Sequence, residues 1–317
     1  MRPRLREYHP YDVREVVALW NRCLPADPIT REIFEEKILL DPSFDPAGCR
    51  VAELGRSTVG FAYALTRRTP LPWGFESAFE LDREAGWVFA LFVHEAHRRQ
   101  GIGSALLQEA LGFLKARGVK TIILADYAPN YLLSGVDTEA YPGAREFFAR
   151  HGFEVQGQSF GMAIALHGFR LPPEAAETEH ALEREGIVVE SFRPDHLLPT
   201  LAFLRDCFPS WLSLFTEKLH RGDDPREMVI ARQEAQVIGY CQRRYGHHVE
   251  RTGPFGVRAE FRGKQIGTLM LYRLLERMAQ EGLRFGWFAQ TGERQRPYYE
   301  RVGYRVIRTH VGMSKRL

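Results

Sequence analysis

The spacing of hydrophobic and polar residues along this chain predicts alternating helices and strands. Apolar residues three and four apart, as in 13–23 and 103–117, are typical of amphipathic helices, and Val/Ile/Phe runs between glycines are typical of buried strands. In the first half we expect a helix, two hairpin strands, a long strand, a helix, a strand, a helix and a last strand. The predicted ranges are 13–23, 49–54, 58–66, 86–93, 103–117, 121–126, 144–151 and 158–166. This order predicts an α/β fold in which helices flank a mixed sheet.

The second half of the chain repeats the first in the same order. Residues 98–119, RRQGIGSALLQEALGFLKARGV, align without gaps with residues 262–283, RGKQIGTLMLYRLLERMAQEGL. Any two amphipathic helices after a turn can look alike, but three shorter matches follow the same order. They are CLP from Cys23 with CFP from Cys207, VAELGRSTVGFAYA from Val51 with VIARQEAQVIGYCQ from Val229, and FFARHGF from Phe147 with YYERVGY from Tyr298. The pattern predicts a tandem pair of one fold.

The matches also predict where the domains begin and end. We expect an N-terminal domain at 1–166, a linker at 167–186 and a C-terminal domain at 187–317. The linker is polar and broken by prolines, and it can include a short solvated helix. The offset between matching segments falls from 184 to 151 residues along the chain, so the first domain has the longer loops. Such loops are where substrate selectivity is usually built.

A basic turn with two glycines links the long strand of the first domain to the next helix. The segment reads WVFALFVHEAHRRQGIGSALL from Trp87. A helix start exposes unpaired backbone N–H groups and the positive end of the helix dipole, so the turn suits a phosphate or pyrophosphate. No Gly-Lys-Ser/Thr follows, which excludes a P-loop, and Leu106, three residues after Gly103, excludes the dinucleotide-binding fingerprint.

This turn resembles the signature of the GCN5-related N-acetyltransferase (GNAT) superfamily, which is Arg or Gln, two residues, Gly, one residue, and Gly or Ala. RRQGIG at 98–103 satisfies it, and the resemblance covers both halves. It implies two tandem GNAT folds, each a mixed, mostly antiparallel sheet with a splayed central strand flanked by helices. It also implies that acetyl-CoA lies along that strand, with its pyrophosphate on backbone amides of the turn. The implied cofactor-binding residues of the first domain are Phe92, Val93, Arg98, Arg99, Gln100, Gly101, Ile102, Gly103 and Ser104.

The second turn, RGKQIG at 262–267, departs from the signature. Gln265 stands where the first required glycine is expected, and its Cβ restricts the backbone angles that it can adopt. Two glycines remain, and an L-residue still offers its N–H, so we keep acyl-CoA binding in the second domain as an expectation. The implied residues are Val257, Arg262, Gly263, Lys264, Gln265, Gly267 and Thr268.

The catalytic residues implied by the resemblance differ between the halves. In the superfamily a Tyr on the last helix often protonates the leaving sulfur, and it stands four residues before the Gly of a terminal Gly-Phe turn. Counting back from Gly303 gives Tyr299, whereas counting back from Gly152 gives Phe148, which has no hydroxyl. Tyr299 is therefore the expected acid, and a core aromatic residue is the alternative. Similarity to tandem enzymes such as mycothiol synthase, where one domain does the chemistry, favours the second domain.

No residue stands out as a general base. His94 and Glu95 follow the first long strand, and His247, His248 and Glu250 precede the second. Solvated residues at strand ends are the simpler interpretation of all five. Many members of the superfamily pass the proton through water, so the lack of a clear base is compatible with catalysis.

The long loop of the first domain, DYAPNYLLSGVDTEAYPGAREFF at 126–148, carries the substrate signal. Its Gly, Pro and Asp content is typical of an ordered loop, and Tyr127, Tyr131 and Tyr141 can form a wall facing a sugar or an amine. The stretch resembles acetyltransferase-like domains connected with amino-sugar metabolism. The implied substrate-binding residues are Tyr131, Asp137 and Tyr141. A glucosamine-type primary amine is the preferred substrate, and a polyamine, an aminoglycoside or a protein amine stays open.

Two other classes of function stay open. A catalytically silent acyl-CoA-binding or regulatory protein is compatible with Phe148 and Gln265. A peptide- or nucleic-acid-binding surface would need a continuous basic face and binding that falls sharply with salt.

Composition narrows these alternatives. The 317 residues include 43 Lys plus Arg against 40 Asp plus Glu, and a net charge of +3 gives no general attraction to nucleic acid. The four cysteines are too far apart for a zinc site or a disulfide framework, so we expect no metal and reduced thiols. No stretch approaches the roughly 18 apolar residues that cross a membrane. We therefore expect a cytoplasmic enzyme that is a monomer or a homodimer.

Overall fold

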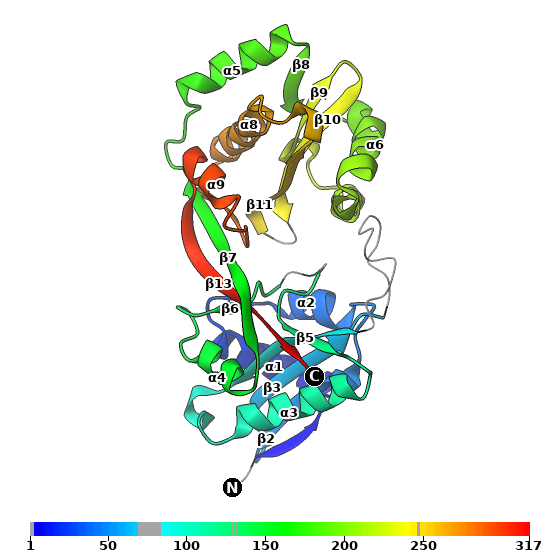
Figure 1. Ribbon diagram of the computed structural model, residues 1–317, viewed down its shortest axis with the longest axis vertical. Coiled ribbons are helices and arrows are strands. Elements are labelled where there is room, and N and C mark those ends of the chain that lie inside the picture. The colour runs from blue at the N-terminus through cyan, green and yellow to red at the C-terminus, as the bar shows by residue number, and fades with distance from the viewer. Residues whose placement is uncertain (1–2, 69–83, 129, 131, 246–247) are drawn as a thin grey trace. The chain divides into compact units, whose positions relative to one another are not determined.

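The computed structural model describes residues 3–68, 84–128, 130, 132–245 and 248–317. Contacts divide this part of the chain into two compact units. Unit 1 contains residues 3–68, 84–159 and 308–317, and unit 2 contains residues 160–307. In each unit, helices pack against a mixed sheet (Figure 1).

The sheet of unit 1 has the order β1-β2-β3-β4-β5-β13, and β6 also pairs with β13. The described pairs are antiparallel except β4 and β5, which are parallel and are connected by α3. Trp20 of α1 packs against Phe92 on one face of the sheet, and Leu107 of α3 and Phe148 of α4 pack on the other. The elements are β1 (Arg4–Glu7), α1 (Val13–Cys23), α2 (Arg31–Phe34), β2 (Cys49–Leu54), β3 (Ser57–Thr66), β4 (Ala85–Val93), α3 (Ile102–Lys115), β5 (Thr121–Leu124), β6 (Val136–Asp137), α4 (Ala144–Arg150) and β13 (Arg305–Arg316).

Unit 2 repeats this plan with the order β7-β12-β11-β10-β9-β8. The parallel pair is β11 and β12, which α8 connects. Helices α5 and α8 bury apolar residues on one side of the sheet, and α6 and α7 do so on the other. The elements are β7 (Glu154–Ala165), α5 (Pro173–Arg184), β8 (Ile187–Ser191), α6 (Leu197–Cys207), α7 (Leu212–His220), β9 (Met228–Gln233), β10 (Gln236–Tyr245), β11 (His248–Val257), α8 (Ile266–Gln280), β12 (Phe285–Phe288) and α9 (Arg296–Val302).

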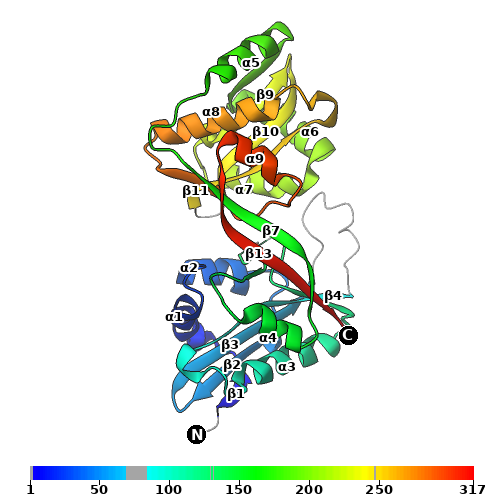
Figure 2. The ribbon, with the colours of Figure 1, turned by 60° about the vertical axis from the view of Figure 1, so that its left-hand side comes forward.

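The last strand of each half belongs to the sheet of the other half. β7 follows α4 but pairs with β12, with Ala165 opposite Phe285. β13 follows α9 but pairs with β5, with Ser314 opposite Ile123. Figures 1 and 2 show both exchanged strands, β7 in green and β13 in red. Each sheet is therefore completed by a strand from the other half, and the last ten residues of the chain belong to unit 1.

The predicted order of helices and strands and the mixed, mostly antiparallel sheets are confirmed. Hydrophobic patterning does not predict the short elements β1, α2 and β6. The linker helix is more than a solvated connection, because α5 buries Ala175 and Leu182 in the core of unit 2 and pairs Glu179 with Arg273 of α8 at 2.5 Å. The domain boundaries 1–166, 167–186 and 187–317 remain a prediction. They describe the sequence repeat, whereas units 1 and 2 exchange the last strand of each half.

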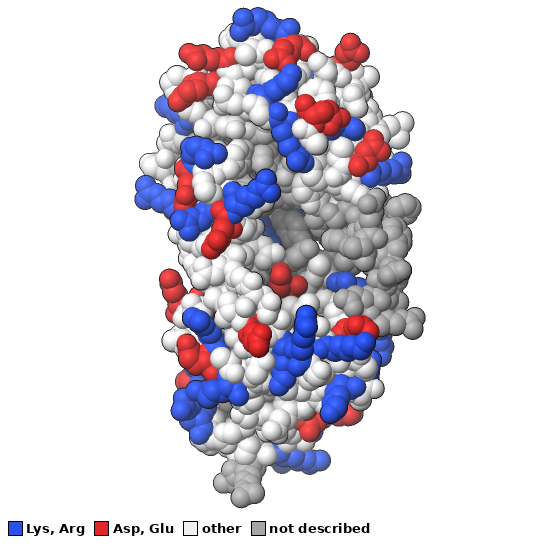
Figure 3. Space-filling model, viewed as in Figure 1, with Lys and Arg blue, Asp and Glu red and all other residues white. Residues whose placement is uncertain are grey.

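The surface mixes charges of both signs. On the face drawn in Figure 3, basic and acidic side chains are interspersed over both units. Exposed side chains of opposite charge also form ion pairs, as Arg22 does with Glu95 at 2.6 Å. No helix within the described ranges is long and apolar enough to span a membrane.

Candidate active site

The parallel strands of unit 1 separate at the carboxyl end of β4. Registered pairs run from Ala85 opposite Thr121 to Val88 opposite Leu124, where β5 ends. β4 continues to Val93, whereas the residue after β5 adopts a φ of +51° and the chain turns away. The edge of β4 that faces β5 is therefore not paired with β5 at residues 89–93.

The corresponding strands of unit 2 also separate. β11 and β12 share one registered pair, Arg251 opposite Trp287. β11 continues for six residues beyond that pair, from Thr252 to Val257, past the end of β12 at Phe288. Both units therefore contain the splayed central strand that the GNAT resemblance implies.

The two basic turns have the same backbone conformation despite their different sequences. In each turn, two positions that are two residues apart have left-handed backbone angles. The φ angles are +61° at Arg99 and +83° at Gly101, and +86° at Gly263 and +61° at Gln265. Gly101 directly precedes α3 and Gln265 directly precedes α8, so the glycine and the non-glycine residue have exchanged places. Gln265 adopts the required conformation, although a non-glycine residue there costs roughly 1–2 kcal/mol.

The arginine that opens each turn binds the strand before it. Arg98 donates from Nε to the carbonyl oxygen of Val93 at 2.9 Å, and Arg262 donates from Nε to the carbonyl oxygen of Val257 at 3.1 Å. These equivalent contacts hold the start of the helix beside the end of the splayed strand. The two guanidinium groups therefore support the turn as well as adding positive charge to it.

Other predicted cofactor residues make specific contacts at the turns. The Ser104 hydroxyl lies 3.1 Å from Nε2 of His151, a residue that the glycine motif does not reveal. Lys264 pairs with Glu185 at 2.5 Å, which offsets its charge. A Cβ at Gly267 would lie 2.8 Å from the ring of a phenylalanine in β11, so this position is crowded.

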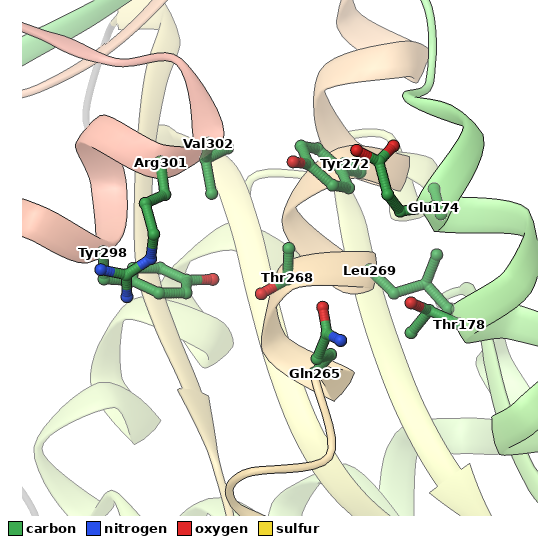
Figure 4. Close-up of a pocket in the computed structure, with 10 residues that line it drawn as sticks. Glu174, Thr178, Gln265, Thr268, Leu269, Tyr272, Tyr298, Arg301 and Val302 are labelled. Carbon is green, nitrogen blue, oxygen red and sulfur yellow. The ribbon is translucent and has the colours of Figure 1, made fainter.

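Unit 2 has a cavity of about 370 Å³ at the start of α8. Figure 4 shows Gln265, which precedes α8, and Thr268 of α8 between Tyr298 and Arg301 of α9 on one side and Thr178 of α5 on the other. The remaining lining residues are Glu174, Ala175, Leu269, Tyr272 and Val302. Of these lining residues, the motif of the second basic turn predicts only Gln265 and Thr268. The match of FFARHGF with YYERVGY contains the α9 pair, whereas no signal in the linker marks the α5 residues.

Tyr299 of α9 lies among aromatic rings. Its ring centroid is 4.5 Å from that of Phe288, 5.1 Å from that of Tyr298 and 5.8 Å from that of Tyr304. Burial raises the pKa of Tyr299 to about 12, so the hydroxyl keeps its proton at neutral pH. In unit 1 the corresponding ring, Phe148, is buried in the core and has no proton to give.

Asp137 and Tyr141 belong to a polar cluster in unit 1. Arg308 donates to Asp137 at 2.7 Å and to the two carboxylate oxygens of Asp27 at 2.6 and 2.9 Å. The Tyr141 hydroxyl donates to Asp27 at 2.5 Å. His310 lies directly opposite Asp137 in the pair of β6 with β13. The loop sequence at 126–148 contains only Asp137 and Tyr141 of this cluster. Asp27 precedes the loop, and β13 supplies Arg308 and His310.

The other two tyrosines of the loop are Tyr127 and Tyr131. Tyr127 is buried in the core beside Trp87, with 5.2 Å between ring centroids, so it does not face a substrate. Tyr131 lies outside the described residues. The polar cluster belongs to unit 1 and Tyr299 to unit 2, so the structure does not bring the predicted substrate-binding and catalytic residues together within one unit.

Three of the five residues considered as general bases have other contacts among the described residues. Nδ1 of His94 accepts a hydrogen bond from the backbone two residues further on at 3.2 Å. Glu95 pairs with Arg22, and this hydrogen bond lowers the pKa of Glu95 to about 2, so it is a poor proton acceptor at neutral pH. His248 packs edge-on against a tryptophan ring of β12, and His247 lies outside the described residues.

Both halves of the chain match one protein-family model. The model is described as the acetyltransferase (GNAT) family, and it matches residues 13–153 and 196–304, which together are more than half of the chain. The chain belongs to the acetyltransferase (GNAT) family. A separate match in each half confirms the tandem GNAT arrangement.

One curated relative is the mycothiol acetyltransferase of Sanguibacter keddieii, which is 25% identical over 209 residues. The match covers 61% of this chain and 62% of that protein, so the chain aligns with about three fifths of the relative's length.

Solved structures share the tandem GNAT fold over nearly the whole chain. A glucosamine N-acetyltransferase region of a fungal multi-domain GH3 β-N-acetylglucosaminidase has a TM-score of 0.76 and 19% identity, covering 98% of this chain and 38% of that one. A GNAT protein from Sphaerobacter thermophilus has a TM-score of 0.70 and 21% identity, covering 99% and 96%. A tandem GNAT protein from the clavulanic acid pathway has a TM-score of 0.68 and 16% identity, covering 99% and 98%. At these identities the similarity shows the fold alone.

Proposed function

We propose that this GNAT-family chain is an acetyl-CoA-dependent N-acetyltransferase for a small-molecule primary amine. The observation that carries the proposal is the same combination in both units: a separated parallel pair beside a left-handed turn that begins a helix. A free strand edge offers N–H and C=O groups to an extended chain such as pantetheine, and a helix start offers N–H groups to phosphates.

The turns have space for a pyrophosphate. A Cβ built on Gly101 or on Gly263 meets no described atom within 4 Å, so each turn borders open space. In unit 1 we assign acetyl-CoA to Phe92, Val93 and the backbone amides of 98–104. In unit 2 we assign it to Val257 and the backbone amides of 262–268. Bound acetyl-CoA supplies the acetyl group as a thioester.

The cavity of unit 2 extends this assignment to the nucleotide. Gln265 and Thr268 line it at the helix start, and Arg301 adds a guanidinium group from α9. A guanidinium can bind two phosphate oxygens at once, which makes Arg301 a suitable partner for the phosphate on the ribose. The aromatic ring of Tyr298 adds an apolar wall.

We assign the proton donor of unit 2 to Tyr299. Its hydroxyl is protonated at neutral pH because burial raises its pKa to about 12, and the surrounding rings limit the access of water. The hydroxyl holds a proton for the sulfur atom that departs when the acetyl group is transferred. This role needs no metal and no second ionisable side chain.

The Tyr299→Phe substitution tests this role. We expect turnover in unit 2 to fall at least tenfold, with little change in acetyl-CoA affinity, because the ring stays and only the proton is lost. Tyr298→Phe, which removes a hydroxyl from the neighbouring ring of the same helix, is the matched control and should retain turnover. Wild-type turnover in Tyr299→Phe would assign the proton to water or the chemistry to unit 1.

The proposed acceptor is an amino sugar such as glucosamine. Asp137 and Tyr141 are the candidate contacts, and Asp137 keeps acceptor capacity because an ionised carboxylate has about four lone-pair sites. Similarity in fold to a glucosamine N-acetyltransferase region supports this choice.

Release of free thiol from acetyl-CoA across a panel of amines tests the substrate class. The panel contains glucosamine, a polyamine, an aminoglycoside and a peptide with a free N-terminus. We expect the highest kcat/KM with glucosamine. Preference for the peptide would identify a protein acetyltransferase, and CoA binding without turnover of any amine would identify a silent acyl-CoA-binding protein.

A further inference from the structure

The exchanged strand β13 carries two polar side chains into unit 1. Arg308 and His310 follow α9 in the sequence but belong to unit 1 by their contacts. His310 lies opposite Asp137 in the β6–β13 pair, and Val311 lies opposite Val136. Both valines pack in the core with residues of α3 and α4. Because side chains alternate along a strand, His310 and Asp137 face the other side of the sheet, which α1 covers.

The register places His310 beside the separation of β4 and β5. Extending the β13–β5 register by one residue brings Met313 to the level of Leu124, which lies opposite Val88 of β4. Three residues further, β13 has reached His310 and β4 has reached Leu91. These two positions flank the region beyond the end of β5, roughly 10 Å further along the strands.

His310 is a buried imidazole with an unused ring atom. Only 4% of the residue is exposed, and its Nδ1 has no hydrogen-bond partner among the described residues. The charged groups around it bind one another, because Arg308 joins Asp137 to Asp27 and Tyr141 donates to Asp27. Buried polar atoms nearly always have a partner in native proteins, so this nitrogen is suited to a ligand that brings its own proton.

The neighbouring charges favour a cationic ligand. Two carboxylates, Asp27 and Asp137, face one guanidinium group, that of Arg308, which leaves one net negative charge. Burial and, after it, the positive charge of Arg308 lower the pKa of His310, so the imidazole is neutral at neutral pH. A single negative charge attracts an ammonium ion, and a neutral imidazole accepts a proton from it.

We propose that unit 1 contains its own site for the acceptor amine, in which His310 takes the proton from the amine. The inference rests on the proposed acetyl transfer and adds the general base that the sequence does not reveal. An ammonium group beside Asp137 gives one proton to Nδ1 of His310, and the freed lone pair bonds to the acetyl carbonyl carbon. The carbon–sulfur bond breaks, the second amine proton goes to the departing sulfur, and His310 passes its proton to water. The products are the N-acetyl amine, the free thiol of CoA and one proton.

The test weakens the chemistry of unit 2 with Tyr299→Phe and then removes the imidazole of His310. Turnover of glucosamine is measured as a function of pH in Tyr299→Phe, in Tyr299→Phe with His310→Gln, and in Tyr299→Phe with the exposed control His180→Gln. At pH 7 we expect His310→Gln to lower the remaining turnover at least tenfold and His180→Gln to leave it unchanged. The loss should shrink as the pH approaches the pKa of the amine, because the free amine then needs no base. Affinity for acetyl-CoA should stay the same.

Each contrary result has a distinct meaning. No turnover in Tyr299→Phe, or turnover that survives His310→Gln, overturns this inference while leaving the proposed function intact. A loss that is equal at every pH also overturns it, because a merely structural role gives that result. No amine turnover in the wild-type protein overturns the proposed function and this inference together.

A second measurement on the wild-type protein does not depend on how the variant folds. Nitrogen-15 spectra of the histidine rings should show His310 neutral at pH 7, and its Nδ1 signal should shift when glucosamine is added. An imidazolium at pH 7, or a signal that does not respond to the amine, would contradict the assignment.

Discussion

Replacing Arg308 with alanine is expected to destabilise unit 1 by about 3 kcal/mol. Arg308 makes two hydrogen bonds with Asp27, one with Asp137 and one with the backbone carbonyl of Ala26. These contacts tie β13 to the loop after α1 and to β6, so they hold the exchanged strand in unit 1.

The magnitude follows from burial. The exposed fraction of the side chain is 23% for Arg308, 15% for Asp27 and 4% for Asp137. Removing one partner of a fully buried ion pair costs about 3–5 kcal/mol, because a charge is left without compensation. Arg308 is not fully buried, and Asp137 keeps hydrogen bonds from the amides of 139 and 140, so the lower end applies.

Urea unfolding combined with hydrogen exchange at β6 and β13 measures this loss, since two units can unfold in separate transitions. Arg305→Ala, at an exposed position of the same strand, is the matched control and should change stability by less than about 0.5 kcal/mol. Arg308→Lys should recover only part of the loss, because an ammonium group cannot bridge both carboxylates as a guanidinium does. Equal stability of Arg308→Ala and Arg305→Ala would refute the reasoning.

Two further predictions concern the turn and acid stability. Gly101→Val should weaken acetyl-CoA binding in unit 1 at least tenfold by calorimetry, because a β-branched residue disfavours φ near +83°, whereas Gly101→Asn should bind nearly normally; equal affinities would contradict this. Unit 1 should lose stability as the pH falls, first through about 6.5, because the lowered pKa of buried His310 means that the unfolded chain binds that proton more readily. A second loss should follow below about 3.9, because hydrogen bonds to Asp137 outweigh its burial and lower its pKa. His310→Gln should abolish only the first step in urea unfolding at a series of pH values, and an unchanged profile would count against the assignment.

The sequence predicts the tandem fold because both halves carry the same local signals in the same order. Glycine before a helix, apolar spacing and strand runs are properties of short segments, so they can be read without knowing the tertiary structure. The same signals locate both basic turns. The sequence gives the residue type at Gln265 but not its φ, and the structure shows a left-handed conformation there.

The strand exchange could not be predicted in this way. Alternation along 158–166 indicates a strand and its two faces but not the edge with which it pairs. Arg308 and His310 are therefore missing from any site argued from the sequence of the first half alone, although they contact Asp137 or lie opposite it. The α5 residues of the unit 2 cavity are missing for the same reason, because a polar linker gives no sign of the helix against which it packs.

The central claim is that both units bind acetyl-CoA by equivalent turns, although one turn has glycine and the other Gln265 before the helix. A crystal structure of the protein with acetyl-CoA tests it most directly. We expect two molecules, each with its pyrophosphate on the amides of 98–104 or 262–268 and its pantetheine along the free edge of β4 or β11. A protein saturated with acetyl-CoA that holds none at these turns, or only one molecule in the whole chain, would contradict it.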